Sequence, residues 1–199
     1  MPETATPPRS IRSAPASTPH QFTREEYFAM ADAGILAPDD SVELIDGQIV
    51  EMSPENSPHR AAIMKASRAF VLALEGKGYA LQTQSTLPLD ERNVPEPDLA
   101  VLRGTPDDVL EEEPAVVLVV EVADTSLEQD RTVKQTLYAQ NDVPEYWVVN
   151  LRDRTVEVYW EPGPSEYRQR RTRSKEEPAT PRFEDAPSFE VESLLPARS

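Results

Sequence analysis

The stretch that decides the fold is "PAVVLVVEVADTS", residues 114–126. Its apolar run, Ala115 to Val120, is rich in β-branched side chains, which is typical of a central strand covered on both faces. The run ends on one carboxylate, Glu121, followed by polar, turn-forming residues. An acid at a strand end is most often solvated, so Glu121 alone does not indicate a functional site. Other residues near it have to support that interpretation.

The sequence before this strand predicts a helix, a hairpin and a second helix. In "FTREEY", Thr23 and Glu26 have the spacing of a capping box. "SVELIDGQIVEM" alternates apolar and polar residues around "DG", the dipeptide preferred in type I′ hairpin turns. A long amphipathic helix follows, with Ser57 as its cap and Pro58 in its first turn.

Two further strands precede the apolar one, "YALQTQS" and "PDLAVLR". After it we expect a helix over residues 131–140, capped by Asp130, and then the strands "EYWVVN" and "TVEVYW". A helix between two strands indicates a crossover connection. The order of elements therefore predicts an α/β fold with one layer of sheet covered by helices.

Composition indicates the bounds of the folded domain and the environment of the protein. Residues 1–20 are rich in proline and predict a disordered tail, residues 21–160 form the expected domain, and residues 161–199 an extension that is partly ordered. The chain has no cysteine and no apolar run long enough to span a bilayer, so we expect a soluble, cytoplasmic protein without a membrane partner. Its net charge of −16 opposes binding to polyanions.

Three carboxylates, Glu43, Asp98 and Glu121, each lie at an edge of a predicted strand. Together they resemble a site for a hard cation, Mg²⁺ or Mn²⁺, whereas zinc is disfavoured by two histidines and no cysteine. Such an ion stabilises the charge on an attacked phosphodiester and lowers the pKa of the attacking water. Asp98 and Glu121 are the expected metal ligands.

Four segments, in order, carry a family resemblance: "ELIDGQIV", "PEPDLAVL", "VVEVADTS", and a lysine and a tyrosine ahead of "VPEYWVVN". They resemble the Uma-family restriction endonucleases of the PD-(D/E)XK nuclease superfamily, over residues 22–160. The resemblance implies a restriction-endonuclease-like core, a central mixed sheet flanked by helices, in a Mg²⁺- or Mn²⁺-dependent endonuclease. By this resemblance Asp98 is the acid of the "PD" motif, Glu121 the second acid, and the Val122 carbonyl a further metal ligand.

The resemblance also implies roles for residues around these ligands. Glu43 resembles the family's additional acid, and Gln84 a glutamine that faces the site. The superfamily lysine normally stands two positions after the second acid, but that position is Ala123. We expect Lys134, on the following helix, to replace it, with Tyr138 on the same helical face. His59, at the start of the long helix, is read as a surface or cap-associated residue.

Two other functions stay open: a catalytically inert nuclease fold that acts as a binding or regulatory module, and an acidic mimic of nucleic acid. The expected substrate is nucleic acid, DNA ahead of RNA, bound with weak non-specific affinity because of the acidic charge. A homodimer is a possible assembly. Catalysis requires the three acids to converge near one ion, whereas a mimic requires carboxylates spread over an exposed face.

Overall fold

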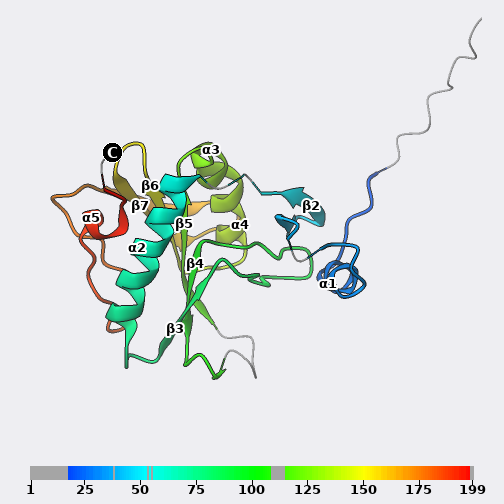
Figure 1. Cartoon of the computed structure of the whole chain (residues 1–199), viewed down its shortest axis with the longest axis horizontal. Coiled ribbons are helices and arrows are strands. Elements are labelled where there is room, and N and C mark those ends of the chain that lie inside the picture. Colours follow the sequence, from blue (N-terminus) through cyan, green and yellow to red (C-terminus); the bar gives the residue numbers. More distant parts are fainter. Residues whose placement is uncertain (1–17, 38, 53, 55, 109–114, 198–199) are drawn as a thin grey trace, which may run out of the picture.

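A computed structural model describes residues 18–37, 39–52, 54, 56–108 and 115–197 (Figure 1). Most of the expected N-terminal tail and the acidic segment 109–113 therefore lie outside the described residues. No helix in the described ranges has the length and apolar character needed to cross a bilayer.

The centre of the fold is a six-stranded sheet in the order β3-β4-β5-β6-β7-β8. β5 and β6 are parallel, and every other neighbouring pair is antiparallel. The expected mixed sheet and the crossover between "VVLVVEVA" and "EYWVVN" are confirmed. The strands are β3 (Tyr79–Thr83), β4 (Leu99–Arg103), β5 (Val116–Ala123), β6 (Glu145–Asn150), β7 (Thr155–Pro162) and β8 (Tyr167–Arg173).

Helices cover both faces of the sheet (Figure 1). α2 (Ser57–Leu74) and α5 (Val191–Leu194) pack on one face, around Phe70 and Trp147. α3 (Leu127–Gln129), the π-helical turn η2 (Asp130–Lys134) and α4 (Gln135–Gln140) lie on the other, where Tyr138 and Tyr146 are fully buried. This explains why β5, between both layers, is apolar along nearly its whole length.

A small N-terminal unit lies beside the sheet and consists of α1 (Arg24–Asp32) and the hairpin of β1 (Val42–Ile45) and β2 (Gln48–Glu51) (Figure 1). Its own core contains Tyr27, Leu44 and Val94. Leu44 and Val94 exchange two backbone hydrogen bonds of 2.8 and 3.2 Å, which fasten the hairpin to the loop before β4. The hairpin is thereby fixed in place, and it carries Glu43.

Local sequence signals predict most element boundaries correctly. Thr23 and Glu26 form the expected capping box. At α2 the expected cap is wrong by one residue, because Asn56 takes the extended cap conformation and its side chain accepts a hydrogen bond from the His59 N–H at 3.0 Å. Ser57 is then the first helical residue.

The chain after Trp160 is more ordered than its composition predicts. β7 continues to Pro162, and the arginine-rich segment 167–173 forms the edge strand β8. Further on, Phe189, Val191 and Leu194 are buried in the same core as α2. The segment 188–195 therefore docks on the core, and the sheet extends by one strand that we did not expect.

Replacing Gly47 with alanine is expected to destabilise the N-terminal unit. Gly47 and Asp46 both have positive φ, 70° and 48°, as the type I′ turn requires. An added Cβ on Gly47 would meet the Gln21 Cβ at 2.8 Å and the Phe22 carbonyl oxygen at 3.2 Å. Thermal unfolding should show a loss of about 2 kcal/mol or more, from strain and overpacking together.

Gly34 is the matched control, because it has the same φ of 70° and no atom of the described residues lies within 4 Å of an added Cβ. Gly34→Ala should cost only about 1 kcal/mol, the backbone contribution alone. Equal losses for the two variants would contradict the packing of Gly47 against Gln21.

Candidate active site

A cavity of about 360 Å³ opens where the C-terminal end of β5 meets the start of α2, the β1–β2 hairpin and η2. Glu43, Asp98 and Glu121 all line it, as do Lys134 and Gln84. The five side chains predicted from the sequence to act together are thus brought to one cavity. They come from five separate segments of the chain, and the hairpin and η2 supply the two that lie outside the six-stranded sheet.

Backbone N–H groups of the neighbouring strand segment hold the carboxylates of Asp98 and Glu121 in place. Asp98 lies just before β4, and its Oδ2 accepts a hydrogen bond from the Val122 N–H at 2.7 Å. Glu121, on β5, accepts one from the Asp98 N–H at 3.2 Å through Oε2. The two carboxylates therefore continue the β4–β5 ladder beyond its last backbone pair, Leu99 with Val120. Their positions are set by the sheet itself.

Lys134 and Glu43 form a buried ion pair in direct contact, the side chains being 8% and 2% exposed. The Lys134 Nζ also lies 3.7 Å from Oε1 of Glu121. Burial alone would lower the pKa of Lys134, but the charges of Glu121 and Glu43 outweigh burial and raise it. Lys134 is therefore held as a cation between the hairpin acid and the strand acid.

Glu121 is a desolvated carboxylate. Burial raises its pKa to about 8, with the Asp98 and Asp130 charges adding to the rise and Lys134 opposing it. The Tyr138 hydroxyl donates a hydrogen bond to its Oε1 at 2.7 Å. Tyr138 thus reaches the site as the family pattern implies, and it fixes one oxygen of Glu121 while Asp98 fixes the other.

The π-helical turn η2 directs two side chains into the cavity, Asp130 and Lys134. Asp130 was expected to cap a helix starting at Arg131, and this is wrong: helical structure begins at Leu127. Residues four apart lie on one face of a helix, and π-helical turns are frequent at functional sites. Asp130 is 5% exposed, accepts a hydrogen bond from Ser126 Oγ at 2.7 Å, and has a pKa raised by burial to about 6.

His59 was expected to be a surface or cap-associated residue; its N–H does bond the cap residue Asn56, but its side chain lines the cavity. Its Nε2 lies 3.3 Å from Oδ2 of Asp98, and its side chain is 15% exposed. The helix start explains this, because the cap at Asn56 orients the first turn of α2 toward the end of β5, where Asn56 Nδ2 donates to Asp124 at 2.6 Å.

Gln84 lies one residue past β3, not on the strand as expected, with a left-handed φ of 42°. Its backbone N–H donates to the Asp98 carbonyl at 3.1 Å, so the bend at Gln84 helps to hold the "PD" segment. The side chain lines the cavity. Ala123, where the superfamily lysine usually stands, is fully buried in the core beneath α4.

The oxygen ligands available here suit Mg²⁺ or Mn²⁺, which keep several water ligands, better than an ion that is coordinated by protein side chains alone. Among the described residues, no three His, Asp or Glu side chains form a ready-made cluster of ligands. Asp98 and Glu121 nevertheless supply two adjoining carboxylates, and Mg²⁺ is commonly bound by one or two carboxylates, with water and substrate phosphate completing its shell. The Val122 carbonyl points to the Asp98 side of β5, since the N–H and C=O of a strand residue point the same way.

Comparison with known proteins identifies the family. A family model described as "Putative restriction endonuclease", Uma2, matches residues 24–193. The chain belongs to the Uma2 family. The match extends past Trp160, includes β8 and reaches into α5. The resemblance carried by the four sequence segments is thereby confirmed.

A solved structure from Anabaena variabilis ATCC 29413, described as a putative nuclease belonging to DUF820, has the same fold as this Uma2 protein. It superposes with a TM-score of 0.65 at 13% identity, covering 87% of this chain and 97% of the other. At this identity the likeness concerns the fold. No curated protein matches the chain.

Proposed function

We propose that this Uma2 protein is a metal-dependent endonuclease that hydrolyses phosphodiester bonds, with DNA as its substrate. The observation that carries the proposal is the buried contact of Lys134 with Glu43 and, at 3.7 Å, with Glu121, beside the interlocked Asp98. Buried charges are costly unless they are paired, and clusters of this kind are concentrated at functional sites.

Each residue has a role that follows from its contacts. Asp98, Glu121 and the Val122 carbonyl would hold Mg²⁺ or Mn²⁺, which supplies stabilisation of the charge on the attacked phosphate and a lowered pKa for the attacking water. Lys134 lies next to Glu121 as a cation and would orient that water and balance charge. Glu43 fixes Lys134, and Tyr138 and His59 fix Glu121 and Asp98.

The acidic character of the chain does not favour the nucleic-acid mimic. A mimic needs its carboxylates on an exposed face, whereas Glu43, Asp98 and Glu121 are 1%, 9% and 6% exposed. Buried acids around one lysine cannot present a phosphate-like surface to a partner. The nuclease proposal accounts for this burial, because a dry site strengthens the electrostatic interactions inside it.

The direct test is cleavage of supercoiled plasmid, single-stranded circular DNA and a structured RNA by the purified protein with Mg²⁺, with Mn²⁺ or with EDTA. We expect nicking and linearisation of DNA only when a divalent ion is present, and loss of both in an Asp98→Asn variant. Cleavage of RNA alone would move the substrate to RNA. Absence of cleavage under every condition would overturn the proposal.

Metal binding is expected to release a proton below about pH 8. In the metal-free protein the pKa of Glu121 lies near 8 because the group is buried, above its ordinary value of 4.5. Between these values the carboxyl carries a proton that the metal-bound carboxylate cannot keep, so binding tightens as pH rises through this range and levels off above it. Calorimetric Mn²⁺ titration in buffers of different ionisation enthalpy should give release of about one proton near pH 6 and almost none near pH 9. An enthalpy independent of the buffer near pH 6 would contradict the raised pKa.

A further inference from the structure

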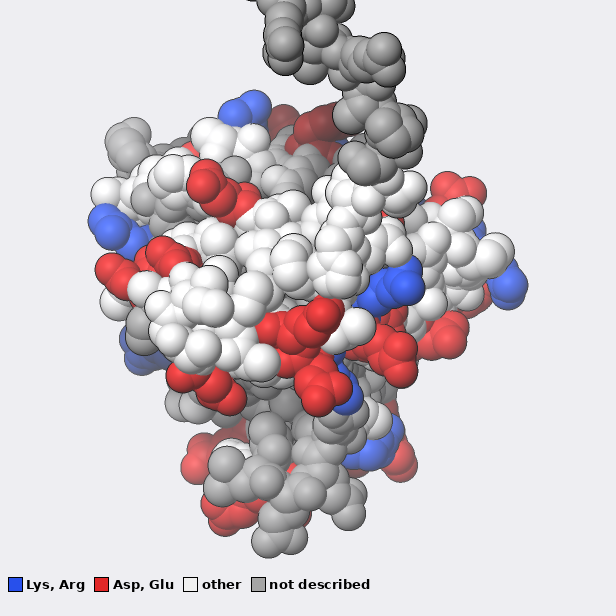
Figure 2. Space-filling model, turned by 90° about the vertical axis from the view of Figure 1, so that its right-hand side faces the viewer, with Lys and Arg blue, Asp and Glu red and all other residues white. Residues whose placement is uncertain are grey.

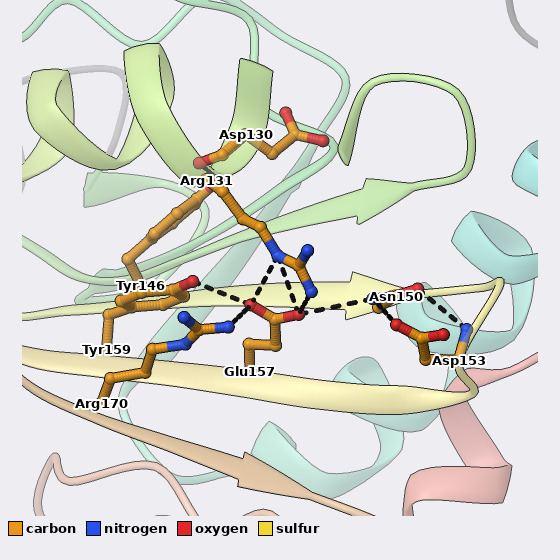
Figure 3. A network of polar contacts seen from close by, with 8 residues as sticks. All are labelled: Asp130, Arg131, Tyr146, Asn150, Asp153, Glu157, Tyr159 and Arg170. Atoms are coloured by element: carbon orange, nitrogen blue, oxygen red, sulfur yellow. Dashed lines mark hydrogen bonds and ion pairs between the residues drawn. The ribbon is translucent and has the colours of Figure 1, made fainter. Parts of the chain in front are cut away.

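A network of polar residues lies beside the cavity, on the same face of the sheet, and includes Asp130, which lines the cavity (Figure 3). Its centre is Glu157 on β7, which is 1% exposed. Arg131 grips both of its oxygens, with Nε at 3.1 Å from each, and Arg170 donates to Oε2 at 2.7 Å. The Tyr159 hydroxyl adds a bond of 2.8 Å. One buried carboxylate therefore orients two guanidinium groups, and these contacts lower its pKa against the effect of burial.

The register of the sheet relates this network to the cavity. Glu121 is paired with Val148 on β6, Val148 with Glu157 on β7, and Glu157 with Thr172 on β8. Glu121 and Glu157 both meet side chains of the α3–η2–α4 layer, so they lie on one face. Strands are spaced about 4.8 Å apart, which puts Glu157 at about 10 Å from Glu121, and β8 at about 14 Å, in a line across the sheet.

β8 continues this positive region. The segment "YRQRRTR" contains four arginines, at 168, 170, 171 and 173, and no acidic residue, in a chain whose net charge is −16. Arg168, Arg170 and Arg171 are exposed on the edge strand. Glu177 contacts Arg171 at 3.6 Å and Arg173 at 3.1 Å. Arg171 and Arg173 pair with Val158 and Val156, whose side chains belong to the core on the other face of the sheet, so these two arginines point to that other face. Arg131, Arg168 and Arg170 are called the arginine edge below.

We propose that the arginine edge binds the phosphodiester backbone of the nucleic acid on one side of the bond that is cut; this inference rests on the proposed nuclease function. Guanidinium groups bind phosphate through paired N–H donors, and five such donors exist on each arginine. Arg170 donates to Glu157 through Nη2, and its guanidinium carbon lies over the Tyr159 ring, 5.2 Å from the centroid. These contacts fix the orientation of the side chain, of which 49% is exposed. One strand of a duplex carries a phosphate per ~3.4 Å of rise, so ~10–14 Å spans about three or four phosphates.

The face that carries α1 and the hairpin does not offer such a surface. Acidic side chains are scattered across it, with basic groups mostly toward its margins (Figure 2). Charged side chains on an edge strand also prevent another chain from pairing with it. Positive or negative side chains would prevent such pairing equally well, and preventing it does not require a buried carboxylate that orients the side chains. The uniform sign of β8 and the Glu157 anchor point to an anionic ligand.

The test is a double variant, Arg168→Gln and Arg170→Gln, which keeps Arg131 bound to Glu157. The control double variant is Arg68→Gln and Lys77→Gln, two exposed residues on α2 and the turn before β3, with the same change in charge. Fluorescence anisotropy with labelled DNA and RNA duplexes over a range of salt gives the affinity and its salt dependence without any cleavage. The duplex bound more tightly by the parent protein identifies the nucleic acid.

We expect the β8 variant to bind at least about tenfold more weakly and its slope of log affinity against log salt to fall by about 1 to 2, one per lost phosphate contact, with little change in the control. Equal binding by the two variants would overturn the arginine edge while leaving the nuclease proposal intact if the parent cleaves. Binding through β8 without cleavage by the parent would support the surface and count against the nuclease. A parent that does not bind would overturn the surface.

Discussion

The Glu121→Gln variant is expected to lose cleavage and to melt at a higher temperature than the parent in the absence of metal. Glutamine keeps the shape of the side chain: its amide oxygen can accept the Asp98 N–H bond and its amide NH2 can donate to the Tyr138 hydroxyl oxygen, but it lacks the charge that a divalent ion needs. Turnover should fall by about 10³ or more, because the variant loses one ligand of the metal ion that would contact the attacked phosphate.

The thermal effect follows from the raised pKa of Glu121. A carboxyl whose pKa is about 8 in the folded protein and about 4.5 when exposed costs stability that grows as pH rises through this range. The neutral variant avoids this cost, so it should gain ~1 kcal/mol or more at pH 8, a rise of ~2–4 °C. Scanning calorimetry at two pH values checks the sign, since the gain should shrink toward pH 5.

Glu145→Gln is the matched control. Glu145 is also buried at 1% exposure with a pKa raised by burial, but it bonds Trp147 and the Arg182 N–H and does not line the cavity. Its replacement should leave cleavage unchanged. A Glu121→Gln variant that cleaves like the parent would contradict the assignment of Glu121 as a metal ligand.

Replacing Lys134 with glutamine is expected to reduce turnover by about 10²–10⁴ and to destabilise the fold by about 3–5 kcal/mol. The loss of stability arises because Glu43 and Glu121 lose their shared cation inside the protein. The loss of turnover arises because no cation orients the attacking water. Denaturant unfolding and single-turnover cleavage measure the two effects separately.

A double variant separates catalysis from folding. In Glu43→Gln with Lys134→Gln, two neutral side chains replace the buried ion pair, so much of the stability should return while turnover stays low. Lys77→Gln, at an exposed lysine, serves as the control and should change neither quantity. Recovery of cleavage together with stability in the double variant would show that Lys134 acts only through the fold.

Features fixed by short-range interactions could be predicted from the sequence. The "DG" turn and the Thr23–Glu26 capping box depend on a few neighbouring residues, and both are present. Asp98 and Glu121 could be placed together because each stands next to an apolar strand, and the family pattern supplied their order. The same pattern pointed to Lys134 across a helix, where spacing alone would not have distinguished it from an exposed lysine.

The features that were missed depend on tertiary contacts. Asp130 resembles a helix cap locally, but it lies within the π-helical turn η2 and lines the cavity. His59 becomes a partner of Asp98 because of how α2 docks on the sheet. β8 has four arginines and little apolar alternation, so its strand conformation comes from pairing with β7. A run of like charges beside a strand-rich segment was the available signal for that edge.

The most direct test of a metal site between Asp98 and Glu121 is titration of the protein with Mn²⁺ up to millimolar concentration. Electron paramagnetic resonance measures the free ion at each step of the titration. The parent protein should bind one ion per chain, and the Asp98→Ala, Glu121→Ala double variant should bind none, although it remains folded. Equal binding by the two proteins, or no binding by the parent, would contradict the account.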